Sequence, residues 1–190
     1  MNAPVLAILD SDLKAPQPAL HKAQQIADAS QRPLHVLVNA YSSAMVRAVG
    51  IDQERQNAAR QQIHGAWEKR IRHLTDREDC ELSILWQKDS MEALRDSIIA
   101  LQPGMAVVHT SAETGLRRHL FTPRDWQLIR KAPCPVLCVH GRAWSSSPRV
   151  LAALDPGNEA QQDDPLAIRV LDAANEIALH LGGSLRACHV

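Results

Sequence analysis

Residues 5–10 read VLAILD, and nearly the same stretch, VLAALD, returns at residues 150–155. Each copy is an apolar run that ends in Asp and leads into a polar loop, a helical pattern and a second apolar run. A repeat that is longer than one secondary-structure element indicates a repeated domain. The sequence therefore predicts one full unit over residues 1–140 and the opening of a second unit over residues 149–190.

The first unit alternates strand-like and helix-like segments. Its apolar runs are short and nearly continuous, which is typical of strands covered on both faces; they lie at 4–9, 34–38, 80–86, 105–109 and 135–139. Helical patterns separate them at 17–30, 52–78, 90–101 and 123–131. Strands that alternate with helices form parallel βαβ units. We therefore expect an α/β fold with a doubly wound five-stranded parallel sheet.

Three local features refine this prediction. Residues 52–78 carry an apolar stripe in which Trp67 is the largest member, so we expect Trp67 to be a core anchor; the other members are Ala59, Ile63, Ile71 and Leu74. Ser90 is a good N-cap for the helix at 90–101. Thr122 and Pro123 resemble a capping box that opens the last helix.

The second unit is predicted to be small. Residues 141–148 are rich in Ser with Gly and Pro and read as a linker. Residues 149–190 then predict a strand, a helix near 164–181 and a strand at 185–190. Such a βαβ segment is too short to bury a stable core alone.

Composition narrows the classes of function. Lys plus Arg and Asp plus Glu both number 21, so no net charge favours nucleic acid or an anionic membrane surface. No apolar run approaches the roughly 18 residues of a membrane span, and the N-terminus lacks the pattern of a signal peptide. The four cysteines form no CxxC pair or metal-ligand spacing. We expect a cytoplasmic protein with buried, reduced thiols and no metal.

Ligands of open α/β sheets bind beyond the carboxyl ends of the strands. Asp10, His109 and His140 stand at three such ends, and a strand order of 3-2-1-4-5 would bring them together. Such a trio suits a metal site or an acid/base pair. The simpler interpretation, which we favour, is an Asp that caps its loop beside two solvated histidines.

A phosphate site needs glycine-rich backbone at the start of a helix. The segment 109–123 has a single glycine, Gly115, and Pro123 removes a backbone donor at the helix start. Arg117 and Arg118 lie in the same segment. They either attract an anion or are simply solvated.

These residues together resemble the universal stress protein family, and within it the tandem, UspE-like members. The resemblance rests on Asp10 after VLAIL, on GLRR at 115–118, on FTPRDW at 121–126 and on RKAPCPVL at 130–137. The resemblance covers residues 3–140, and it begins again at residue 149 with the second copy. It implies a Rossmann-like sheet of the adenine nucleotide alpha hydrolase type, with strand order 3-2-1-4-5.

The ATP-binding members of that family carry a glycine, two residues, a second glycine, nine residues and then Gly-Ser or Gly-Thr. The matching positions here hold His109, Ala112, Thr122 and Pro123. Asp10, which matches the acidic residue that contacts adenosine, is retained. The resemblance thus implies a non-catalytic stress-response module that is structural or binds a small ligand, without a cofactor. The alternatives are a nucleotide-binding switch and a metal-dependent enzyme.

The resemblance also implies a mode of association. In related proteins the fifth strands of two units pair across a pseudo-twofold axis. Here the second unit has no fifth strand, so Val136–Val139 would present an unpaired apolar edge. We therefore expect a homodimer that uses this edge and residues 149–190.

Overall fold

The computed structural model describes residues 3–50, 52–110, 124–154 and 165–189. Two compact units make up the chain. The first comprises Met1–Ala27 and Gln31–Gly141, and the second comprises Asp28–Ser30 and Arg142–Val190. The division between Gly141 and Arg142 falls at the start of the segment that the sequence marks as a linker.

The first unit is built on a five-stranded parallel sheet. Its strands are β1 (Val5–Ile8), β2 (Leu34–Asn39), β3 (Cys80–Leu85), β4 (Met105–His109) and β5 (Val136–Val139). They lie in the order β3-β2-β1-β4-β5, and every neighbouring pair is parallel. The predicted fold class and strand order are therefore confirmed. Every residue of β1 and β2 is buried, which explains why both strands are mainly apolar without alternation; the polar residues of β2 are His35 and Asn39.

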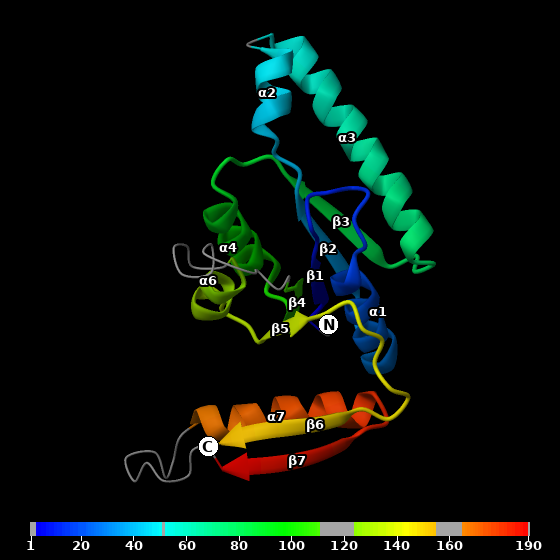
Figure 1. Cartoon of the computed structure of the whole chain (residues 1–190), viewed down its shortest axis with the longest axis vertical. Coiled ribbons are helices and arrows are strands. Elements are labelled where there is room, and N and C mark those ends of the chain that lie inside the picture. Colours follow the sequence, from blue (N-terminus) through cyan, green and yellow to red (C-terminus); the bar gives the residue numbers. More distant parts are fainter. Residues whose placement is uncertain (1–2, 51, 111–123, 155–164, 190) are drawn as a thin grey trace. The chain divides into compact units, whose positions relative to one another are not determined.

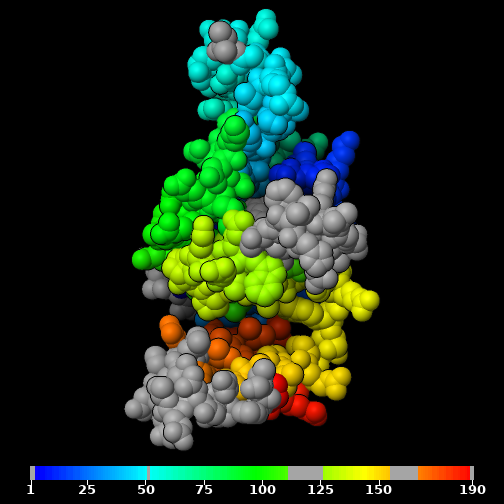
Figure 2. All heavy atoms as spheres, turned by 60° about the vertical axis from the view of Figure 1, so that its left-hand side comes forward, coloured from blue at the N-terminus to red at the C-terminus, as the bar shows by residue number. Residues whose placement is uncertain are grey.

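Helices cover both faces of this sheet (Figure 1). Helices α1 (Pro18–Ser30) and α3 (Gln53–Leu74) lie on one side, and α4 (Ser90–Leu101) and α6 (Arg124–Lys131) lie on the other. Figure 2 shows α4 in green directly beside α6 in yellow-green. Beneath these two helices is a cluster of buried apolar side chains; its members are Leu6, Ile8, Leu37, Leu94, Ile98, Ala106, Val108 and Leu128.

The region between β2 and β3 differs from the prediction. Helix α2 (Ser43–Val49) was missed, because its short and mixed sequence carries no clear stripe. Helix α3 is capped by the Asp52 side chain and ends at Leu74, four residues short of the expected end. Only Trp67 and Ile71 of the predicted stripe are buried. The first half of α3 extends past the sheet with α2 (Figure 1), so its apolar residues are half-buried.

The cap of α4 is also different from the prediction. Asp89, not Ser90, accepts hydrogen bonds from the backbone N–H groups of Met91 and Glu92. Ser90 is the first helical residue. Asp and Ser are about equally good N-caps, so their succession left the position of the cap ambiguous by one residue.

The second unit is a single parallel βαβ motif, as predicted. It consists of β6 (Arg149–Leu154), α7 (Pro165–His180) and β7 (Ser184–His189). Gly182 adopts a φ of +61°, which a side chain disfavours, and a Cβ at Gly183 would collide with the carbonyl group of Pro148. Leu151 on β6 remains 63% exposed, so this unit covers its apolar surface incompletely.

The four cysteines are free thiols, but they are half-buried rather than buried as expected. Cys134 precedes β5, and Cys138 lies on it. Burial raises the pKa of the Cys80 and Cys134 thiols. Both therefore stay protonated and are poor nucleophiles. None of the described helices is long and apolar enough to cross a membrane.

Candidate ligand-binding site

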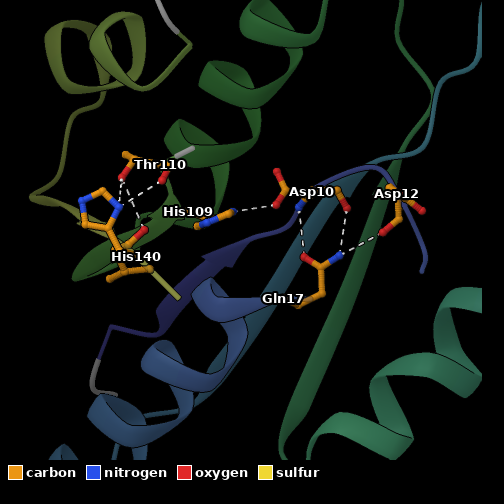
Figure 3. A network of polar contacts seen from close by, with 7 residues as sticks. Asp10, Asp12, Gln17, His109, Thr110 and His140 are labelled. Atoms are coloured by element: carbon orange, nitrogen blue, oxygen red, sulfur yellow. Dashed lines mark hydrogen bonds and ion pairs between the residues drawn. The ribbon is translucent and has the colours of Figure 1, made fainter. Parts of the chain in front are cut away.

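The carboxyl ends of β1 and β4 bring Asp10 and His109 together. The two strands pair in register from Val5 opposite Met105 to Ile8 opposite Val108. The chain continues past Ile8 to Asp10, so its carboxylate reaches the imidazole of the last β4 residue. Asp10 Oδ2 lies 2.9 Å from His109 Nδ1, as Figure 3 shows.

The Asp10 contact defines which nitrogen of His109 carries hydrogen. An ionised carboxylate can only accept, so Nδ1 must donate. In the neutral imidazole Nε2 is then an acceptor, and it has no hydrogen-bond partner among the described residues. The Asp10 side chain is 41% exposed and that of His109 is 25% exposed. The pair is thus held in place and still accessible to a small molecule.

Gln17 positions the loop that carries Asp10. Its side chain is at the start of α1 and is only 1% exposed. The amide oxygen accepts from the Asp10 N–H at 3.1 Å, and the amide nitrogen donates to the carbonyl groups of Asp10 and Asp12 at 3.3 and 3.1 Å (Figure 3). Sequence reasoning missed Gln17. Its one signal is a polar residue between Pro16 and Pro18 at the start of a helix.

His140 does not join the pair. Its imidazole is exposed and turned toward Thr110 (Figure 3), where Nδ1 lies 3.2 Å from the Thr110 carbonyl oxygen and 3.3 Å from Oγ1. The Thr110 N–H in turn donates to the Val139 carbonyl at 3.0 Å. The three side chains therefore form a pair with a separate neighbour. The favoured interpretation of two solvated histidines fits the exposed His140 but not His109, which contacts Asp10. Thr110 is a second residue that the sequence did not single out.

The metal hypothesis gains no support from the described part of the chain. No group of three His, Cys, Asp or Glu side chains in it lies close enough to hold a metal ion. The remaining candidates of the fourth loop fall outside the described residues; they are Ala112, Gly115, Arg117, Arg118, Thr122 and Pro123. Their roles, including the Thr122-Pro123 cap, stay predictions from sequence.

The geometry suits a ligand that donates hydrogen bonds. Asp10 supplies a carboxylate with unused acceptor capacity, and His109 Nε2 supplies a second acceptor on the neighbouring strand. Hydroxyl groups of a sugar or polyol, or a protonated amine, have the donors that such acceptors need.

The comparisons with known proteins agree with this fold. A sequence model of the universal stress protein family matches residues 1–140. The chain belongs to the universal stress protein family. Universal stress protein E of Photorhabdus laumondii is 26% identical over 167 residues, which cover 85% of this chain and 53% of that protein. Universal stress protein E of Escherichia coli K12 is 22% identical over 192 residues, which cover 95% and 60%.

A solved structure shares the fold of this chain. A protein of unknown function from Pseudomonas aeruginosa PAO1, PA1789, superposes with a TM-score of 0.69 at 24% identity. The match covers 98% of this chain and 60% of that one. At this identity the likeness shows the fold alone. The chain thus spans about half to three fifths of the length of the relatives that it matches.

Proposed function

We propose that this universal stress protein is a cytoplasmic stress-response module whose first unit binds a small hydroxyl-bearing or amine-bearing ligand at Asp10 and His109. The ligand site itself carries out no chemistry and needs no cofactor. The observation that carries the proposal is the 2.9 Å contact that fixes His109 Nδ1 on Asp10 and leaves Nε2 as an acceptor. Four free thiols suit a reducing compartment such as the cytoplasm.

The same site is poorly suited to a triphosphate. His109, Ala112 and Thr122 add side chains where ATP-binding members have glycines, and Pro123 lacks the N–H that a phosphate would accept. Close approach of phosphate to backbone N–H groups relies on such glycines.

A nucleotide-binding switch is the alternative within the same family. The retained Asp10 favours it, because a carboxylate with a free oxygen can accept from the two hydroxyl groups of a ribose. Binding of a nucleoside without phosphates would agree with both proposals. Tight binding of ATP would agree only with the nucleotide-binding switch.

Restoring the glycine motif tests the reason for weak phosphate binding. In the variant that combines H109G, A112G, T122G and P123S, we expect the dissociation constant for Mg-ATP to fall at least about tenfold, or about 1.4 kcal/mol. Isothermal titration calorimetry measures it, with H109G alone as the partial control. A folded quadruple variant whose ATP affinity equals that of the wild type would show that the missing glycines are not the cause.

We also propose that the chain forms a homodimer through β5 and residues 149–190. β5 is an edge strand of the sheet, and its residues Val136, Leu137 and Cys138 are only half-buried. An edge of this kind is a template for pairing with another strand. Light scattering at micromolar concentration should give twice the 21.0 kDa chain mass, and a monomer mass for the V136K variant. A monomer mass for the wild type would contradict the proposal.

A further inference from the structure

A second His-centred cluster lies at the other end of the sheet. His35 is the second residue of β2 and pairs in register with Glu81 of β3, and Ser83 follows Glu81 on the same face. His35 Nε2 lies 2.8 Å from Ser83 Oγ, and His35 Nδ1 lies 3.3 Å from Glu81 Oε2. Neither Asp10 nor His109 takes part in these contacts.

One arrangement of hydrogens satisfies both contacts. The Glu81 carboxylate can only accept, so His35 Nδ1 carries the hydrogen. His35 Nε2 is then an acceptor, and the Ser83 hydroxyl donates to it. This is the order of groups that activates a serine nucleophile, in which an acid orients a histidine and the histidine accepts the hydroxyl proton.

We propose that Ser83 is an activated nucleophile that accepts acyl groups from esters of small apolar acids. In the reaction, Ser83 Oγ attacks the ester carbonyl carbon while its proton passes to His35 Nε2. The bond from carbon to the leaving oxygen then breaks, and that oxygen takes the proton from Nε2 as it departs. The products are an acyl ester on Ser83 and a free alcohol or phenol.

The surroundings fit this chemistry. The His35 side chain is 7% exposed, and its burial lowers the pKa of the imidazole, although the nearby Glu81 charge partly opposes this shift. The imidazole is therefore neutral near pH 7, which is the form that accepts a proton. The thiol of Cys80 on the same strand is not a competing nucleophile, because burial raises its pKa.

An open hollow beside the cluster provides room for an acyl group. Its volume is about 500 Å³, within the range of small-molecule sites. His35 and Glu81 border it together with Gln31 and four apolar residues, which are Pro4, Pro33, Leu34 and Leu101. Ser83 is not a bordering residue and adjoins the hollow through its contact with His35. A short unbranched acyl chain matches this lining better than a charged one.

The test uses the full chain and p-nitrophenyl butyrate, with the modified residue located by peptide mass spectrometry. We expect one butyryl group on Ser83 in the wild type and none at that position in Ser83→Ala. His35→Gln should slow acylation of Ser83 by about 100-fold or more, the usual contribution of a general base. Glu81→Gln should slow it by about fivefold or less, because the Glu81 side chain is 80% exposed and water screens its charge.

Ser97→Ala is the matched control. Ser97 is also a half-buried serine, but its hydroxyl donates to the Ala93 carbonyl at 2.8 Å instead of to an imidazole. Acylation of Ser83 should be unchanged in this variant. The absence of butyryl from Ser83 in folded wild-type protein, or an equal rate in the wild type and His35→Gln, would overturn the proposal.

Discussion

Trp67→Ala should lower the free energy of unfolding of the first unit by about 3–5 kcal/mol. Trp67 is 2% exposed and is the largest fully buried side chain of the described residues. With Ile71 it is one of only two buried residues on α3. Its removal therefore leaves a cavity where this long helix meets the sheet. Urea denaturation followed by circular dichroism measures the loss.

Trp126→Ala is the control for this experiment. Trp126 lies on α6 and is 58% exposed, so the same truncation removes little buried area. We expect a change within about 0.5 kcal/mol, as for most surface substitutions. Equal losses for the two tryptophans would mean that α3 does not hold the sheet through Trp67.

Gln17→Ala should cost about 1–3 kcal/mol of unfolding free energy. The substitution leaves one N–H and two carbonyl groups of the β1–α1 loop without the amide that now satisfies them. Hydrogen exchange should report the effect locally, because the Asp10 N–H loses its acceptor and exchanges faster. The same loop carries the Asp10 carboxylate, so ligand affinity should fall as well.

Gln62→Ala provides the comparison for Gln17. Gln62 is an exposed residue of α3, and alanine is a better helix former than glutamine. This variant should keep the wild-type stability and the protection of the Asp10 amide. Unchanged protection in Gln17→Ala would show that the amide network does not position the loop.

The sheet could be predicted because strands that are buried on both faces have nearly continuous apolar sequences. β1 is apolar at every position and β2 at four of its six positions, and the alternation of such strands with helices permits few topologies. The elements that the sequence did not predict have weaker signals in it. α2 is a short helix with no buried residue, so nothing in its periodicity separates it from a loop.

The candidate site was predictable only in outline. The strand-end rule placed Asp10 and His109 at one edge of the sheet, and the structure joins them directly. The same rule grouped His140 with them, but its side chain instead bonds to Thr110, since a strand end fixes the position of a Cα atom and not the direction of a side chain. Gln17 acts through contacts with backbone atoms, which leave no motif in a single sequence.

Calorimetric titration of the 190-residue chain with Mg-ATP tests the central claim most directly. The account predicts a dissociation constant weaker than about 1 mM, which corresponds to about −4 kcal/mol of binding free energy. The low affinity follows from the absence of the phosphate-binding glycines and of a backbone N–H at Pro123. A dissociation constant in the low micromolar range that is lost in Asp10→Asn would contradict the account and establish the nucleotide-binding switch.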